Sequence, residues 1–496
     1  MQGLFGIFEA VFKKINQPNM AITIIGDRGV EDILSTEQKA LRINLNKSIF
    51  GTFSEIGAGQ ETVRNFFSVG GASRTIAKAV SAYGKEFSDA IYGKEDDGRY
   101  VTESRLRKML SHELELIEER IDRSKHRDKL FFSFANTVAT IDYTKKYQGH
   151  GWVGLRYQTK PDEDYSEIIL HVRFHENKAL YQQNTLGTLG VNLIYYAYYH
   201  YDSPKLLLRH LYDHIDKDLL EIDTINFSGP CFKDVDNRLM SLQLIRNGMT
   251  DAVMFAPDGH NMLISDELYN KNVLAVRGSF RPVTKVNMDL YERSKERFLK
   301  EDGVNADNTI SIFEMTLHNL RAEGKVDEKD FIDRADLLCA MGQTVVISTF
   351  KEYYKLVEYL DRYSNEKKVL AMGVDNLIYI FDEHYYNDLT GGTLEAFGKL
   401  FTENLRIFLY PYKNQDTGEI SDSNNLKVKK EMHELYKYFK KNGKFVDIVD
   451  YDEAYLDIFS HQVLEMISKG EEGWEEKLPA DVTELIKEKS LFGYKA

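Results

Sequence analysis

The sequence predicts an α/β fold: a helical N-terminal region, a mixed α/β middle and a Rossmann-like parallel α/β C-terminal half. Hydrophobic residues make up 43% of the 496 residues and charged residues 29%, which is typical of a folded globular protein. Helical periodicity dominates up to about residue 128, and β-rich runs begin after Leu130. From about residue 308, strand-like and helix-like segments alternate, as they do in a parallel sheet with covering helices.

These changes of pattern divide the chain into four expected parts. They are an N-terminal amphipathic helix and linker (1–46), a helical region (47–128), a mixed α/β domain (129–305) and a Rossmann-like α/β domain (306–496).

The first expected helix covers residues 3–15 and carries large apolar side chains on one face. An exposed apolar stripe of this size must be covered by protein or by lipid. We expect it to pack on its own domain or on a sister subunit, and we expect a homo-oligomer. Docking to a membrane surface through residues 3–15 is the alternative.

The helical region contains three expected helices. The first covers residues 61–69, the second lies within 72–93, and the third begins after Thr102, whose side chain can cap it. Gly70, Gly71, Ser73, Arg74 and Lys78 either form a corner between two helices, which we favour, or meet an anion at a helix N-terminus.

A Gly-x-Gly motif, Gly57-Ala58-Gly59, precedes the first of these helices and is typical of a nucleotide-binding loop. A dinucleotide fold also needs a second strand that ends in an acidic residue, whereas the residues that follow favour helix. We therefore interpret the motif as a turn that opens the helix at Glu61, with nucleotide binding as the alternative.

The middle of the chain is expected to be mainly β at first and then mixed. Residues 131–143, 151–158 and 166–175 are β-rich runs that should pair as antiparallel neighbours. Helices are expected at 179–200 and 204–216, followed by strands at 219–229, 250–259 and 272–280 and a helix at 236–248.

In the C-terminal half, short apolar runs separated by helical segments predict a parallel sheet. Its expected strands are Ile310–Phe313, Val345–Ile347, Leu370–Met372 and Ile407–Leu409.

Candidate anion-binding residues lie near the ends of the expected strands, where ligands bind in open α/β sheets. They are Ser228, Gly229, Arg238, Arg277, Ser279, Arg281 and Lys285. We expect the three arginines to converge near Ser228–Pro230 and to hold a phosphate or carboxylate group. The alternative is a surface loop with salt bridges.

One histidine is a candidate acid or base. His150 lies between two glycines and precedes Trp152, which would leave it accessible for proton transfer. A tight hairpin turn is the slightly favoured alternative. His171 and His175 share one face of an expected strand but have no evident third ligand, so no metal site is expected.

The net charge and the cysteine content limit which partners and which compartment we expect for this protein. The net charge of −14 argues against a nucleic-acid surface but permits a small phosphorylated ligand. Two cysteines without a Cys-x-x-Cys motif suggest a reducing cytoplasm, and no run of ~18 apolar residues predicts a transmembrane helix.

Two segments resemble motifs of nicotinic acid mononucleotide adenylyltransferases. Gly373, Asp375 and Asn376 are similar to a Gly-x-Asp-Ser/Asn motif, and Ile347, Ser348 and Thr349 to an Ile-Ser-Ser/Thr motif. This resemblance implies nucleotide binding by Gly373, Asp375, Asn376, Ser348 and Thr349. The family's His-x-Gly-His motif is missing, and the two motifs stand in the opposite order.

The whole chain also resembles a large uncharacterised bacterial protein family that is loosely labelled either as such an adenylyltransferase or as a TonB-dependent receptor. The segments that carry this resemblance are "INFSGPCFKDVDNRLMSLQL" and "RGSFRPVTK". We expect the receptor label not to apply, because a receptor barrel needs many alternating lipid-facing strands.

Together these features predict a cytoplasmic protein that binds a nucleotide or phosphorylated metabolite and acts as a nucleotidyl- or phosphoryl-transferase. The expected cofactor is a nucleotide, either ATP or an NAD precursor, with Mg²⁺. The alternative is a non-catalytic homo-oligomeric scaffold or filament-type protein.

Overall fold

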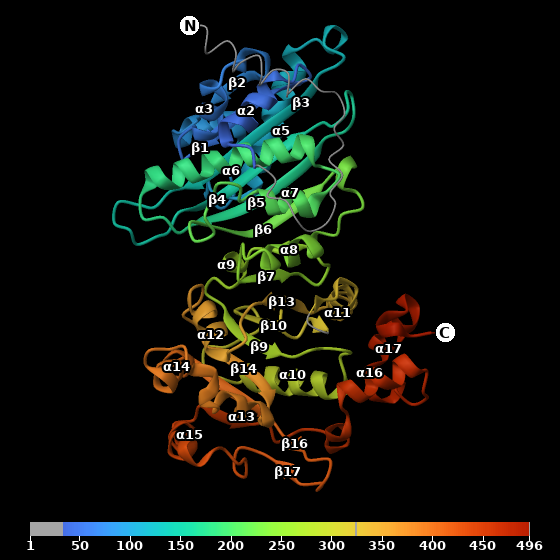
Figure 1. Ribbon diagram of the computed structural model, residues 1–496. Coiled ribbons are helices and arrows are strands. Elements are labelled where there is room, and N and C mark those ends of the chain that lie inside the picture. The colour runs from blue at the N-terminus through green and yellow to red at the C-terminus, as the bar shows by residue number, and fades with distance from the viewer. Residues whose placement is uncertain (1–32, 323–324, 496) are drawn as a thin grey trace. The chain divides into compact units, whose positions relative to one another are not determined.

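The computed structural model describes residues 33–322 and 325–495, and residues Thr36–Ala496 form one compact unit. The expected helix at 3–15 lies outside the described residues. Within the compact unit, most strands belong to a six-stranded sheet or an eight-stranded sheet (Figure 1). The predicted α/β fold class is confirmed.

The six-stranded sheet is built from the N-terminal half of the chain. Its strands are β1 (Ile49–Ile56), β2 (Ile76–Val80), β3 (Leu130–Ala139), β4 (His150–Tyr157), β5 (Ser166–Phe174) and β6 (Leu220–Ser228). The α-helices of this half are α2 (Thr36–Leu45), α3 (Glu61–Ser68), α4 (Lys85–Tyr92), α5 (Glu103–Arg120), α6 (Ala179–Tyr199) and α7 (Pro204–His210).

This sheet is mixed, with the strand order β2-β1-β3-β4-β5-β6. The neighbours of β1 are parallel to it, whereas β3 to β6 form an antiparallel series, as predicted for the runs that became β3, β4 and β5. On one face α5 packs with Leu110 close to Gly154. On the other face α3 packs with Phe66 against Phe53, and Figure 1 shows the long helix α6 lying across the strands.

The region 47–128, which was expected to be helical, holds two strands. Residues 72–93 form a short 3₁₀ turn, then β2 and then α4, so the helix expected within this segment is limited to α4. The strand β1 was missed because its buried positions include polar residues such as Thr52, Ser54 and Glu55. Each finds an internal partner: Ser54 bonds to Tyr92, for example, so the strand needs no apolar run.

The eight-stranded sheet is built from the C-terminal half. Its strands are β7 (Ala252–Phe255), β8 (Asn261–Met262), β9 (Asn272–Arg277), β10 (Thr309–Thr316), β13 (Thr344–Ser348), β14 (Lys368–Gly373), β15 (Leu405–Tyr410) and β18 (Phe445–Asp447). Two small hairpins, β11 (Arg321–Ala322) with β12 (Lys325–Val326) and β16 (Tyr412–Lys413) with β17 (Ile420–Ser421), lie outside it.

The α-helices of this half cover both faces of the sheet. They are α8 (Asn237–Arg246), α9 (Ile264–Glu267), α10 (Lys285–Phe298), α11 (Glu328–Ala340), α12 (Tyr353–Asp361), α13 (Leu377–Ile380), α14 (Gly392–Leu400), α15 (His433–Lys441), α16 (Ser460–Lys469) and α17 (Ala480–Lys489). On one face Tyr291 of α10 packs on Phe313, and Phe331 of α11 packs on Phe255. On the other face α12, α13, α14 and α15 share one large apolar core with the strands.

The strand order of this sheet is β18-β15-β14-β9-β10-β13-β7-β8. The first six are parallel, β7 pairs antiparallel with β13, and β8 pairs antiparallel with β7. Counted along the chain from β9, the six parallel strands follow the Rossmann order 3-2-1-4-5-6. The four strands predicted to be parallel all belong to this series. Its central strand β9 precedes the expected start of the Rossmann-like domain at residue 306.

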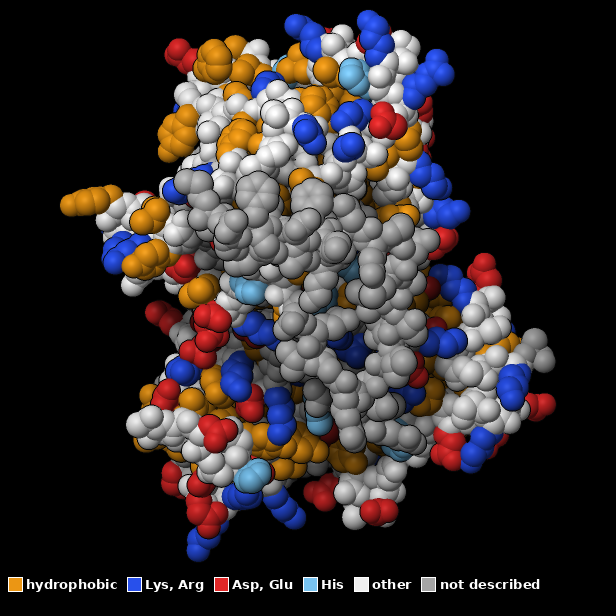
Figure 2. Space-filling view, turned by 45° about the horizontal axis from the view of Figure 1, so that its top comes forward, with side chains coloured by type: hydrophobic (Ala, Val, Ile, Leu, Met, Phe, Trp, Pro, Cys, Tyr) orange, Lys and Arg blue, Asp and Glu red, His pale blue; other side chains and the backbone are white. Residues whose placement is uncertain are grey.

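None of the helices within the described residues has both the length and the apolar character needed to cross a membrane. Where the surface in Figure 2 shows described residues, acidic and basic side chains are interspersed on it.

Candidate functional site

A pocket of about 480 Å³ lies at the carboxyl ends of the parallel strands in the C-terminal sheet. Its lining comes from the residues that end or directly follow β9, β10, β13 and β14. In the Rossmann order, β9 and β14 are the neighbours between which the strand order reverses. Ligands of open α/β sheets bind in the crevice at this point. We call this the switch-point pocket.

The lining of the switch-point pocket is mostly aromatic and polar. It consists of Arg277, Gly278, Ser279, Thr316, His318, Asn319, Lys351, Glu352, Tyr353, Asn376, Tyr379, Tyr385 and Tyr386.

The base of the pocket is held by a charged pair between neighbouring strands. Arg277 donates from Nε to Glu314 Oε2 at 2.5 Å and from Nη2 to Oε1 at 3.0 Å. Ser348 Oγ donates to the same Oε1 at 2.5 Å, and Glu314 has no exposed surface. Because both charges are hydrogen-bonded in this way, the pair is fixed before any ligand arrives.

Tyr353 joins this pair to the wall of the pocket. Its ring lies against the Arg277 guanidinium, with 4.5 Å from Cζ to the ring centroid. Its hydroxyl donates to Asn376 Oδ1 at 3.5 Å. Burial raises the pKa of Tyr353 to about 12, so the hydroxyl keeps its proton at neutral pH.

Two features of the pocket favour an anionic group. Lys351 has no carboxylate partner among the described residues; its Nζ lies 5.0 Å from the centroid of the Tyr385 ring. Helix α12 begins at the pocket with Tyr353, and no side chain caps its N-terminus. Free N–H groups and the helix dipole both attract negative charge at such an end.

The predicted anion site does not form as one cluster. Arg238 pairs with Asp236 and Asp336, Arg281 with Asp330, and Arg277 with Glu314. The expected convergence of the three arginines near Ser228–Pro230 is therefore wrong, because each guanidinium is neutralised by a separate carboxylate.

The other members of the predicted anion site are also divided. Of the full set, Arg277 and Ser279 line the switch-point pocket. Ser228 and Gly229 lie at the end of β6, in the other sheet. Lys285 lies in a separate pocket beside Asp289 and Arg293.

The residues implied by the adenylyltransferase resemblance lie around the switch-point pocket but play different parts. Asn376 lines the pocket, and Ser348 donates a hydrogen bond to Glu314 at the base of the pocket. Gly373 ends β14, and burial raises the pKa of the neighbouring Asp375 carboxyl. Thr349 is directed elsewhere, because its hydroxyl donates to Asp251 at 3.1 Å.

The Gly-x-Gly motif stands between β1 and α3, and a second parallel strand, β2, follows. The secondary structure of a nucleotide-binding unit is thus present, contrary to expectation. At the N-terminus of α3, however, the place where an anion would bind is occupied by a carboxylate of the protein itself. Glu55 accepts hydrogen bonds from Thr62 N at 3.3 Å and Val63 N at 2.9 Å. The predicted turn that opens the helix at Glu61 is confirmed.

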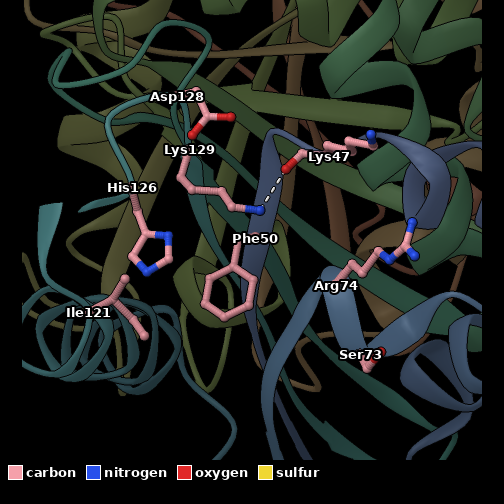
Figure 3. A pocket seen from close by; sticks show the side chains of 8 residues that line it. All are labelled: Lys47, Phe50, Ser73, Arg74, Ile121, His126, Asp128 and Lys129. Atoms are coloured by element: carbon pink, nitrogen blue, oxygen red, sulfur yellow. Dashed lines mark hydrogen bonds between the residues drawn. The ribbon is translucent and has the colours of Figure 1, made fainter. Parts of the chain in front are cut away.

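Another pocket of about 480 Å³, shown in Figure 3, lies at an edge of the N-terminal sheet where parallel strands begin. Phe50 and Lys129 stand at the start of β1 and just before β3, and Arg74 precedes β2. Lys129 Nζ donates to the backbone oxygen of Lys47 at 2.5 Å and lies 5.5 Å from the Phe50 ring centroid. These are the amino ends of parallel strands, which favours the switch-point pocket as the ligand site.

His150 lies on β4 in a third pocket, where it contacts His171. Within the described residues, no group of three or more His, Cys, Asp or Glu side chains has an arrangement that would hold a metal ion.

Sequence reasoning passed over Glu314, Lys351, Tyr353 and Tyr379. Each lies within a few residues of the C-terminal end of a strand that was predicted correctly. Because ligands of open α/β sheets bind at the carboxyl ends of parallel strands, the position of these residues near predicted strand ends is a signal that could have identified them.

No protein-family model matches the chain, and no curated protein matches it either. Among solved structures, a competence-damaged protein (CinA) superfamily protein from Enterobacter cloacae is similar, with a TM-score of 0.26 and 10% identity over 35% of this chain and 98% of that one. A competence/damage inducible protein from Agrobacterium tumefaciens gives 0.23 and 14%, over 32% and 93%. A CinA superfamily protein from Escherichia coli gives 0.22 and 11%, over 34% and 94%. Because these TM-scores are low, the proposed function is based on the geometry of this chain alone.

Proposed function

We propose that this protein binds a nucleotide or a similar phosphorylated metabolite in the switch-point pocket. The observation that carries the proposal is the position of the pocket at the carboxyl ends of β9 and β14, where the order of the parallel strands reverses.

Different residues of the lining are suited to bind the base, the phosphate and the ribose of such a ligand. Tyr379, which is 56% exposed, and Tyr385 offer ring faces on which a base can stack. Lys351 and the N-terminus of α12 attract a phosphate group. The side-chain oxygen of Asn376 accepts from Tyr353 and has a second lone pair that can accept from a ribose hydroxyl.

Transfer of a nucleotidyl or phosphoryl group is the activity that such a ligand would serve, because catalysis of this transfer depends on positioned cations and N–H donors. Mg²⁺ is expected to arrive on the phosphates of the nucleotide.

A thermal-shift panel of adenine nucleotides, NAD precursors and sugar phosphates, each with and without Mg²⁺, tests the proposal. A ligand that binds only the folded state stabilises it by ~2.7 kcal/mol at a hundredfold excess over its dissociation constant. Lys351→Ala should abolish the shift. Lys437→Ala, which removes an exposed lysine paired with Glu434 on α15, should retain it.

Failure of every ligand to raise the melting temperature would contradict the proposal and favour the non-catalytic scaffold. A shift that survives in Lys351→Ala would place the ligand elsewhere on the protein.

A further inference from the structure

Three side chains on neighbouring strands of the N-terminal sheet are connected by hydrogen bonds. These strands are distant in sequence from the strands that form the switch-point pocket. His150 Nδ1 on β4 lies 3.1 Å from His171 Nε2 on β5. His171 Nδ1 lies 2.7 Å from Asp223 Oδ1 on β6, and Arg173 Nε donates to Asp223 Oδ2 at 2.7 Å. His171 is completely buried and Asp223 is 8% exposed, whereas His150 reaches the surface of a pocket.

A β-bulge brings Asp223 into this chain. His171 stands opposite Thr224, and the next pair is Val172 with Ile222, so Asp223 is the extra residue on β6. In a regular strand Asp223 would point to the opposite face from Thr224. The bulge re-aims its carboxylate toward His171, as bulges near functional sites commonly do.

The carboxylate determines which ring nitrogens carry protons. Burial raises the pKa of Asp223, but His171 and Arg173 outweigh it and hold the pKa below its usual value. An ionised carboxylate only accepts, so His171 donates from Nδ1 to Asp223, and its Nε2 pairs with Nδ1 of His150. We assign the proton of this second bond to His150 Nδ1, which leaves a lone pair on Nε2 of His150.

The pocket around His150 has a volume of about 760 Å³ and is lined by Arg362. Among the residues that the structure describes, the Arg362 guanidinium has no carboxylate partner, and its Cζ lies 5.7 Å from the centroid of the Tyr359 ring. Trp152 also lines the pocket and packs edge-on against His171, with 5.0 Å between ring centroids, which keeps that ring in place. The pocket thus combines a hydrogen-bond acceptor and a guanidinium group.

We propose that this pocket is a second ligand site, in which His150 Nε2 accepts a hydrogen bond from the hydroxyl group of a small molecule that also carries a phosphate or carboxylate group. Arg362 binds the acidic group. His171 and Asp223 are positioning residues. The inference does not depend on nucleotide binding at the switch-point pocket.

The surroundings keep His150 neutral over a wide pH range. Burial lowers its pKa to about 4, and the Arg173 charge acts in the same direction, against Asp223. The other charged groups that line the pocket are Arg99, Asp266, Asp361 and Arg362. A neutral imidazole offers one ring nitrogen as a hydrogen-bond acceptor.

Diethyl pyrocarbonate, which acylates unprotonated imidazole nitrogen, tests this in the full chain, with peptide mass spectrometry to follow each histidine. A histidine with the reference pKa of about 6.5 should react about tenfold more slowly at pH 5.5 than at pH 7.5. His150 should react at nearly equal rates at the two pH values. A tenfold loss of its rate at pH 5.5 would overturn the proposal.

Tautomer state separates a positioning role from a purely structural one. Nitrogen NMR should show His150 protonated at Nδ1 and not at Nε2. His171→Gln keeps an acceptor for this proton and should preserve the tautomer, whereas His171→Leu should lose it. A proton on Nε2 of His150 in the unsubstituted protein would overturn the proposal even if the Leu variant does not fold.

Two probes then test the ligand class. Either glycerol 3-phosphate or glycerate should slow the acylation of His150 about tenfold at ten times its dissociation constant, and the probe that does so identifies the acidic group. Arg362→Ala should remove this protection. Arg406→Ala, at an exposed arginine paired with Glu301, should keep it. Protection by neither probe, or protection that survives in Arg362→Ala, would refute the site.

Discussion

Arg277 and Glu314 stand directly opposite each other on the parallel strands β9 and β10, and their side chains form a two-bond ion pair beneath the switch-point pocket. The carboxylate is fully buried, and the guanidinium is 8% exposed. The floor of the proposed ligand site therefore depends on a fully buried carboxylate and a guanidinium that is largely buried.

Replacing one partner of this pair should be strongly destabilising. Glu314→Gln keeps the shape but leaves the Arg277 charge buried without its counter-ion, which costs about 3–5 kcal/mol in comparable pairs. Urea unfolding should show this loss. Glu434→Gln, which removes an exposed carboxylate paired with Lys437, is the control and should leave the midpoint unchanged. Equal midpoints for the two variants would show that the buried pair is not needed for stability.

Acid should weaken a second buried network, centred on Asp213. Burial raises the pKa of this carboxyl, but hydrogen bonds from His210, Lys39 and Tyr196 lower it to about 2. A depressed native pKa gives stability that is present above the unfolded pKa of about 4 and lost as the pH falls toward 2. Burial also lowers the pKa of Lys39, the cation that pairs with this carboxylate.

The pH dependence is best measured against Asp213→Asn. We expect the variant to be less stable than the parent protein at pH 7, and the difference in unfolding free energy to shrink between pH 4 and pH 2. A difference that stays constant or grows over this range would contradict the assignment.

Glu55 should contribute to stability through the start of α3. Its carboxylate accepts from Thr62 N, Val63 N and Asn136 Nδ2, all buried. Glu55→Ala leaves these donors without a partner and should lower the free energy of unfolding by about 1–3 kcal/mol. Gln60→Ala is the matched control, because the Gln60 side chain makes no capping bond to the same helix. Similar losses in the two variants would refute the capping role.

We expect no dinucleotide synthesis from ATP and nicotinic acid mononucleotide. Two side chains of the similar motifs are engaged within the protein, since Ser348 bonds to Glu314 and Thr349 to Asp251. The His-x-Gly-His motif is also missing from the sequence. Purified protein and a chromatographic assay for the dinucleotide decide this. Turnover that is lost on Asp375→Ala would show that the adenylyltransferase resemblance extends to activity.

Much of the fold follows from local sequence signals. Thr102 caps α5 as expected, accepting from Arg105 N at 3.1 Å. Short β-rich runs separated by turns located β3, β4 and β5, and strand–helix alternation located the parallel strands of the C-terminal sheet. The strands β3, β4 and β5 are buried over most of their length, which apolar and aromatic composition indicates.

Other features depend on partners that are distant in sequence. Arg238 bonds to Asp336, 98 residues away, and Arg277 to Glu314, 37 residues away, so a cluster of arginines in the sequence became separate ion pairs. The polar strand β1 is buried only because residues from other elements satisfy its side chains. Asp223 was missed because a bulge, which has no local sequence signal here, directs it toward His171.

A crystal structure with the nucleotide that gives the largest thermal shift tests the central claim most directly. We expect the ligand in the switch-point pocket, with its phosphate near Lys351 and its base against Tyr379, at the carboxyl ends of β9 and β14. Ligand density in the pocket formed by Phe50, Arg74 and Lys129, or at any other surface with the switch-point pocket empty, would contradict the account.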